Sequence, residues 1–194
     1  MTPQNTFAAL ARKYKTPKQV QQFLRAYPYN RAETMRSAYT SLQHNEAHCF
    51  EATFIAAAIL ELNGYPPLIV SFESMDGLDH VIFVFKENGR WGSVARSRDE
   101  GLHGREPVFR SIRDLIWSYY ASYIDGSGKI IGYQLASLDD TGADWRTGKK
   151  NIWKAEKYLL KLKHRPLKSS EAYYQKLLRK FRKHGHLMPE KYGW

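Results

Sequence analysis

Cys49 is the only cysteine among the 194 residues, and it opens the segment CFEATFIAAAILEL at residues 49–62. Alanine, leucine and isoleucine dominate this segment and apolar residues fall on nearly every face, which predicts a buried helix. The free N–H groups and the dipole at a helix N-terminus stabilise a thiolate, and a thiolate is the stronger nucleophile at neutral pH. The alternative is a structural cysteine that behaves as a small hydrophobic residue.

His80 follows about thirty residues later and opens the run HVIFVF at residues 80–85. This β-branched and aromatic run predicts a strand. A strand packed across the N-terminus of the Cys49 helix could bring the imidazole to the thiol, and histidine is a natural general base near neutral pH. The alternative is a histidine at a strand edge with no chemical role.

The remaining segments predict the elements that would position this pair. Thr16-Pro17 reads as a helix start, Asn63-Gly64 as a helix stop and Lys86 to Gly89 as a hairpin turn. We expect an α+β fold in which N-terminal helices and one buried helix pack on a mostly antiparallel sheet, with a basic helical extension at the C-terminus. The predicted helices are 16–27, 32–42, 49–62, 111–123, 151–163 and 170–184; the predicted strands are 68–72, 80–85, 90–95 and 129–135, and 97–107 is predicted to be a loop.

The order of these motifs resembles the transglutaminase-like superfamily, which shares its core with papain-like thiol peptidases. The resemblance covers roughly residues 35–100 and consists of a cysteine at a helix start, a helix ending in glycine, an x-Pro strand, and a histidine opening a hairpin with glycine and tryptophan at its turn. The matching segments are Ala47-His48-Cys49, Asn63-Gly64-Tyr65-Pro66, Asp79-His80-Val81 and Gly89-Arg90-Trp91.

The resemblance implies a mechanism of acyl transfer. Cys49 would attack an amide or ester carbonyl, and His80 would accept the thiol proton and later protonate the leaving amine. The acyl group would then pass to water or to a second amine. The backbone N–H of Cys49 and a side-chain donor would stabilise the oxyanion. Gln43 is the candidate donor because papain-like enzymes place a glutamine at a similar offset; the alternative is a solvated residue at a helix end.

Two positions depart from the superfamily pattern. Ala47 stands where glycine is usual, and Ala95 stands about fifteen residues after the histidine, where the acidic third residue is expected. Asp99 has the right chemistry to replace that residue, with Ser97 and Ser93 as the other polar neighbours. A plain cysteine–histidine dyad and a core without activity remain open.

Zinc is a further possibility near the thiol. The potential ligands are His44, His48, Cys49 and His80. Zinc sites usually have more tightly paired ligands, so we expect neither a metal nor another cofactor. The pair His184 and His186 is a weaker candidate still.

Charge divides the sequence into two parts. Residues 1–148 are neutral, whereas residues 149–194 carry 14 Lys and Arg against 3 Asp and Glu and hold the whole net charge of +11. We therefore predict a core domain at 1–148 and a basic extension at 149–194. The extension suits an acidic partner such as nucleic acid, an anionic membrane or an acidic protein; the alternative is a solvated helical face that packs its leucines on the body.

The composition limits the compartment and the function class. The longest apolar run, residues 54–60, is too short to span a membrane, and residues 1–18 contain no apolar stretch of signal-peptide length. With a single cysteine, we expect a cytoplasmic protein. We expect a thiol-dependent hydrolase or acyltransferase acting on amides of a protein or peptide. The alternative is a catalytically degenerate binding module that uses residues 149–194 on nucleic acid or an acidic protein.

Overall fold

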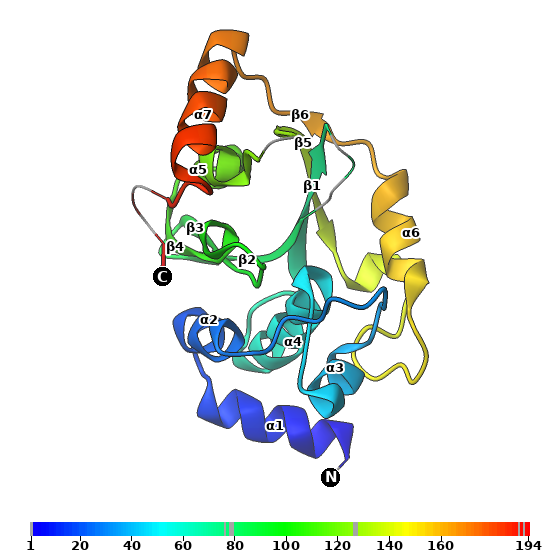
Figure 1. Cartoon of the computed structure of the whole chain (residues 1–194). Helices are drawn as coiled ribbons and strands as arrows, with labels where there is room; N and C mark the ends of the chain where they lie inside the picture. Colours follow the sequence, from blue (N-terminus) through cyan, green and yellow to red (C-terminus); the bar gives the residue numbers. More distant parts are fainter. Residues whose placement is uncertain (1, 76, 78–79, 126–127, 190, 192) are drawn as a thin grey trace.

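The computed structural model describes residues 2–75, 77, 80–125, 128–189, 191 and 193–194. Its centre is one antiparallel sheet with the strand order β4-β3-β2-β1-β5-β6. The strands are β1 (Leu68–Ser74), β2 (Val81–Glu87), β3 (Arg90–Val94), β4 (Arg105–Phe109), β5 (Ile130–Ser137) and β6 (Arg165–Pro166). Helices cover both faces of this sheet (Figure 1), so the predicted α+β class is confirmed.

The helices divide between the two faces. They are α1 (Pro3–Lys13), α2 (Pro17–Arg25), α3 (Ala38–His44), α4 (Cys49–Leu60), α5 (Ile112–Tyr123), α6 (Trp153–Lys161) and α7 (Glu171–His184), with short 3-10 turns at Glu61–Asn63, Glu100–Leu102 and Asp139–Thr141. α1 to α4 and α6 pack into one buried cluster, and α5 and α7 pack into a second on the opposite face of the sheet.

The apolar run that forms β2 shows why two clusters are needed. Phe83 and Phe85 point into the α4 cluster, whereas Ile82 and Val84 point into the α5 cluster. Successive side chains of a strand face opposite sides of its sheet, so a strand buried on both faces has no polar alternation. Burial on both sides fixes the strand that follows His80.

Local signals set several element ends as predicted. Thr16 caps α2 in a capping box with Gln19, and Pro17 stands at the first helical position. Asn88 and Gly89 both have positive φ, 48° and 76°, as a tight hairpin turn between β2 and β3 requires. Glycine also ends the turn after α4, where Gly64 has φ of 87°.

Two predicted elements differ from the structure. The predicted helix 32–42 begins only at Ala38, because residues 30–36 bend around the buried carboxylate of Glu51 and donate hydrogen bonds to it. The predicted loop 97–107 includes the first three residues of β4, which pairs with β3 from Trp91 opposite Phe109 to Ser93 opposite Arg105. A strand that depends on a distant partner has little local signature.

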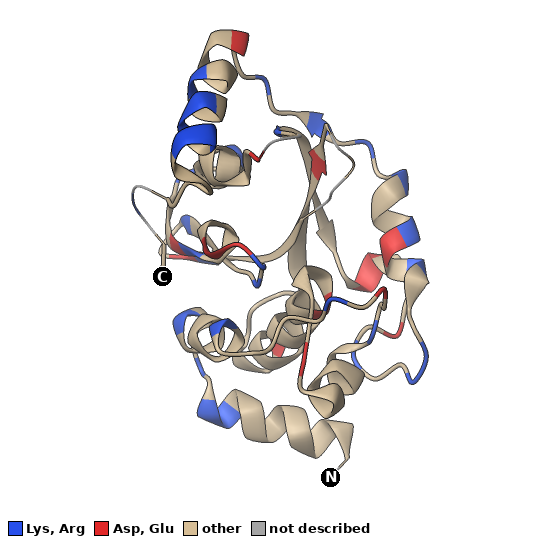
Figure 2. Ribbon diagram, viewed as in Figure 1, with Lys and Arg blue, Asp and Glu red and all other residues tan. Residues whose placement is uncertain are grey.

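Residues 149–194 are continuous with the body. Ala155 and Leu159 of α6 belong to the α4 cluster, Tyr174 and Leu177 of α7 belong to the α5 cluster, and β6 extends the sheet beside β5. The basic residues of α7 are exposed, and Figure 2 shows them on successive turns of this helix.

None of the helices in the described part of the chain is both long enough and apolar enough to cross a lipid bilayer.

Candidate active site

Cys49 is the first residue of α4, and His48 is its N-cap. The helix starts here because of a capping box: the Phe50 N–H donates to His48 Nδ1 at 3.2 Å, and the His48 N–H donates to the Glu51 carboxylate at 3.2 Å. Cys49 is partly exposed, while every other residue of this helix is buried. Cys49 is therefore the residue of α4 that is not fully enclosed, and it lines two cavities.

His80 lies immediately before β2 and is only 4% exposed. Its ring lies edge-on to Phe72, with the centroids 5.5 Å apart, and beside Tyr119. Its Nε2 is 3.1 Å from the backbone carbonyl oxygen of Leu102, which can only accept a hydrogen bond. This contact puts the proton on Nε2 of the neutral ring and leaves Nδ1 for the thiol.

The thiol lies between two imidazoles. Burial alone would raise the pKa of Cys49, but hydrogen bonds from the side chains of His48 and His80, together with their charges, outweigh burial and hold the pKa well below that of a free thiol. The arrangement thus favours the thiolate that was expected from the helix start.

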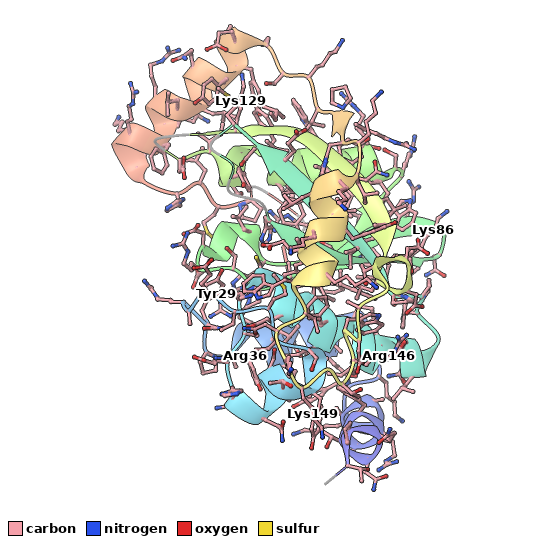
Figure 3. All side chains as sticks on the ribbon, turned by 90° about the vertical axis from the view of Figure 1, so that its right-hand side faces the viewer. Tyr29, Arg36, Lys86, Lys129, Arg146 and Lys149 are labelled. Carbon is pink, nitrogen blue, oxygen red and sulfur yellow. The ribbon has the colours of Figure 1, made fainter. Side chains whose placement is uncertain are left out.

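Tyr29 supplies a third contact to the cysteine. Burial, followed by the nearby charge of Cys49, raises the pKa of the Tyr29 hydroxyl to about 12, and this hydroxyl is hydrogen-bonded to both the backbone and the side chain of Cys49. A tyrosine with this pKa keeps its proton at neutral pH and remains a hydrogen-bond donor. Figure 3 labels Tyr29 beside the lower end of α6, where the N-terminal helices meet the rest of the chain.

Two cavities meet at Cys49, and Tyr29 and Arg98 line both of them. The larger, of about 600 Å³, lies between α4 and α6 and is also lined by His48, Trp153 and Glu156. The smaller, of about 180 Å³, is also lined by His80, Ser97, Asp99 and Asp125. Each cavity therefore contains one of the two imidazoles that contact the sulfur.

The structure brings Asp99 near the pair but does not join it to His80. Asp99 lines the smaller cavity with Cys49 and His80, and its carboxylate is 3.5 Å from Nε2 of His186. Among the described residues, no hydrogen bond or ion pair links Asp99 to His80. The Leu102 carbonyl occupies the position on the imidazole where an acidic third residue would act.

The serines considered as replacements lie differently. Ser97 lines the smaller cavity, and its hydroxyl accepts the Asp99 N–H at 3.2 Å. Ser93 is fully buried, bonds to the Tyr119 hydroxyl at 2.7 Å and lines neither cavity at Cys49. At the position of the usual acid, the backbone of Ala95 is bound by Gln21.

Gln43 and His44 stay apart from the sulfur. Both are exposed on the last turn of α3, and neither lines a cavity that the described residues form around Cys49. In the same part of the chain, no group of three or more His, Cys, Asp or Glu side chains could hold a metal ion. Asp79, part of the motif that suggested the superfamily, lies outside the described residues.

The sequence suggests His48 only as a potential zinc ligand, and it does not assign Glu51 or Tyr29 to the site. The capping pattern of His48 with Glu51 three residues later was readable, but it indicates a helix start and not a charge pair. Nothing local marks Tyr29, because its contact with Cys49 depends on how the segment before α3 packs.

No known protein-family profile matches the chain, and no curated protein matches it significantly.

Proposed function

We propose that the protein is a thiol-dependent acyltransferase or hydrolase acting on amide bonds of a peptide or protein, with Cys49 as nucleophile and His80 as general acid and base. One observation carries this proposal: Cys49 lies at a helix N-terminus, at the meeting point of two cavities, with hydrogen bonds from two histidines that lower its pKa. The resemblance of residues 35–100 to the transglutaminase-like superfamily supports the same chemistry.

The reaction would proceed in two steps, acylation and deacylation of Cys49. The Cys49 thiolate attacks the amide carbonyl carbon; the C–S bond forms, the C–N bond breaks, and protonated His80 gives its proton to the leaving amine. Water or an amine then attacks the thioester and loses its proton to His80, and the thiolate leaves. The Cys49 N–H and the Tyr29 hydroxyl, which lies against Cys49, would donate hydrogen bonds to the oxyanion.

The cavities suggest how a substrate would lie. The larger cavity has apolar walls from Phe50, Trp153 and Leu159 and would hold the acyl portion. The smaller cavity is polar and would hold the leaving or accepting group. A single cysteine that works as a thiolate suits a reducing compartment, and we place the reaction in the cytoplasm.

The test needs no cofactor. We would incubate the protein with a peptide library bearing backbone and side-chain carboxamides, in ¹⁸O-water or with hydroxylamine as acceptor. We expect an acyl adduct on Cys49 by mass spectrometry, and ¹⁸O-carboxylate or hydroxamate products that disappear in Cys49→Ala. A pH 4–10 profile of iodoacetamide alkylation that matches a free thiol, with a pKa of about 8.5, and that is the same in His80→Ala would contradict the proposal.

A second candidate function concerns the surface of α7. Five basic side chains of this helix are exposed, and none of them makes an ion pair with a described residue: Lys176, Arg179, Lys180, Arg182 and Lys183. A cavity of about 540 Å³ between α5 and α7 lies beside them, and its walls include Trp117, Leu177 and Met188. Basic rims around an apolar groove suit an acidic protein segment with apolar side chains.

The aromatic rings here favour a protein partner over nucleic acid. Trp117 stacks on Tyr120 at 4.8 Å and on Tyr173 at 6.0 Å, so their faces are already occupied and less available to bases. We would measure binding of a fluorescent glutamate–tyrosine copolymer, with polyglutamate and single-stranded DNA as comparisons. Preferential binding of the copolymer, lost in Lys176→Glu/Lys180→Glu, supports this function; preference for DNA contradicts it.

A further inference from the structure

Glu51 is a fully buried carboxylate in the first turn of α4. Its oxygens accept four hydrogen bonds: from Asn30 Nδ2 at 2.9 Å, Thr34 Oγ1 at 2.6 Å, the Arg36 N–H at 2.9 Å and the His48 N–H at 3.2 Å. All four donors are neutral groups. They satisfy the hydrogen-bonding capacity of the carboxylate, but they do not neutralise its charge.

Among the described residues, His48 is the only side chain able to carry a positive charge within 4 Å of the Glu51 carboxylate. Its Nε2 is 3.6 Å from Glu51 Oε1. The guanidinium of the nearby Arg36 is turned to Glu46, at 2.8 Å, and only its backbone N–H reaches Glu51. A buried carboxylate without a countercharge is strongly disfavoured, so Glu51 favours the imidazolium form of His48.

The ring of His48 is also the group next to the thiol. Its Nε2 is 2.7 Å from the Thr34 carbonyl oxygen, which fixes the ring and takes one proton. In the imidazolium, Nδ1 carries a second proton and can donate to the Cys49 sulfur. Nδ1 lies 3.2 Å from the Phe50 nitrogen, and it accepts the Phe50 N–H only when the ring is neutral. The charge on His48 thus decides which partner Nδ1 binds.

The pKa shifts of His48 and Glu51 agree with this geometry. Burial lowers the pKa of His48, but its hydrogen bond to Cys49 and the charges of Cys49 and Glu51 outweigh burial and raise the pKa overall. Burial raises the pKa of Glu51, but the charge of His48 and the hydrogen bonds from Asn30 and Thr34 lower it overall. Both shifts favour a charged pair.

We propose that Glu51 and His48 form a fixed charge pair that maintains Cys49 as a thiolate, which leaves His80 to move protons between the substrate groups. The two imidazoles line different cavities, and the Nε2 of each faces a backbone carbonyl, but among the described residues only His48 also has a carboxylate oxygen within 3.6 Å. This division of roles rests on the proposed function, but the charge pair is measurable without any substrate. Glu51 is therefore a positioning residue that acts through His48.

The groups that titrate or carry charge around the sulfur come from every segment that lines the two cavities. The larger cavity has Tyr29, Arg31, Glu33, His48, Arg98 and Glu156, and the smaller has Tyr29, His80, Arg98, Asp99, Asp125 and His186. Burial and the charge of Cys49 raise the pKa of Tyr29 to about 12, so this hydroxyl keeps its proton while a thiol titrates. Among the described residues only His48 forms an ion pair with Glu51, so a change in the titration on replacing Glu51 reports on His48.

The experiment is a thiolate titration by absorbance at 240 nm in the substrate-free protein, whose single cysteine makes the signal specific. Glu51→Gln keeps the size of the side chain but removes its charge. We expect this variant to lower the thiolate-to-thiol ratio at a given pH at least tenfold. In a His48→Asn background, the same replacement should have almost no further effect, because the coupling passes through His48.

Thr34→Val provides the matched control. It removes one hydrogen bond to Glu51 and leaves the charge in place, so it should shift the ratio far less than Glu51→Gln does. The proposal is overturned if folded Glu51→Gln has the wild-type thiolate-to-thiol ratio. It is also overturned if Glu51→Gln lowers this ratio just as much in the His48→Asn background.

An NMR titration of His48 in the wild-type protein avoids any folding defect of the variants. The imidazolium should persist above the pH at which a free histidine loses its proton, and an ordinary or lowered midpoint also overturns the proposal. If the charge pair is found but no substrate is acylated, the proposed function fails while this inference stands.

Discussion

Near Cys49 a charged side chain is buried, whereas on the surface of α7 the charged side chains are exposed. Near Cys49, Glu51 is fully buried, accepts hydrogen bonds from residues 30–36 and from the His48 N–H, and lies against one histidine. On α7, five basic side chains are exposed and make no ion pair with described residues. Buried charges must be paired and are therefore fixed in position. Exposed charges instead attract a charged partner collectively, and salt weakens this attraction. The first region suits chemistry and the second suits association.

The largest expected effect separates the two regions completely. Cys49→Ala should abolish acyl transfer, and His80→Ala should reduce it by about 10²–10⁴-fold because proton transfer to the leaving group is lost. Both variants should bind the acidic copolymer at α7 as the wild-type protein does. Parallel turnover and binding assays check this expectation, and loss of copolymer binding in Cys49→Ala would show that the regions are not independent.

Tyr29→Phe sharpens the description of the site itself. The hydroxyl bonded to Cys49 keeps its proton because its pKa is about 12, and loss of this oxyanion donor should reduce kcat by about 10²-fold. Gln43→Leu serves as the comparison, since this exposed side chain lies outside both cavities. If Gln43→Leu reduced kcat as much as Tyr29→Phe does, Gln43 would be an oxyanion donor, as the offset in papain-like enzymes suggests.

Charge reversal on α7 should weaken copolymer binding by about tenfold or more, and the binding of the wild-type protein should fall steeply with salt. The variant Lys176→Glu/Lys180→Glu should alkylate at Cys49 with the wild-type pH profile, because α7 packs on the other face of the sheet. Fluorescence anisotropy at 50 and 300 mM salt measures the first effect and iodoacetamide kinetics the second. A changed alkylation profile would reveal coupling between the two regions.

The smallest effect concerns the segment 97–105, which supplies the Leu102 carbonyl to His80. Burial lowers the pKa of the nearby His103 to about 4, and the charge of Arg96 acts in the same direction. The unfolded chain, with a histidine pKa of about 6.5, therefore binds more protons than the folded chain between these values. The free energy of unfolding is undiminished above pH 6.5 and should fall by on the order of 2 kcal/mol towards pH 4.

Denaturant unfolding at several pH values checks this dependence. His103→Gln should flatten it between pH 4 and 6.5, whereas the exposed His44→Gln should leave it as in the wild-type protein. An unchanged slope in His103→Gln would assign the acid sensitivity to other groups.

The sequence by itself determined the elements that carry the candidate site. The composition of residues 49–60 specifies a buried helix, and the apolar run after His80 specifies a strand buried on both faces. These features follow from propensity, from caps such as Thr16 and from the Asn88-Gly89 turn, which involve neighbours in the chain. They were enough to predict the α+β class and to single out Cys49 and His80.

Only the tertiary structure decided what surrounds this pair. It orients His80 through the Leu102 carbonyl, 22 residues away, and pairs Asp99 with His186 from the C-terminal segment. It also brings α6, more than one hundred residues after Cys49, to the wall of the larger cavity. Such contacts depend on how separate elements pack, and no local pattern of residue types encodes which carbonyl or carboxylate will meet a given imidazole.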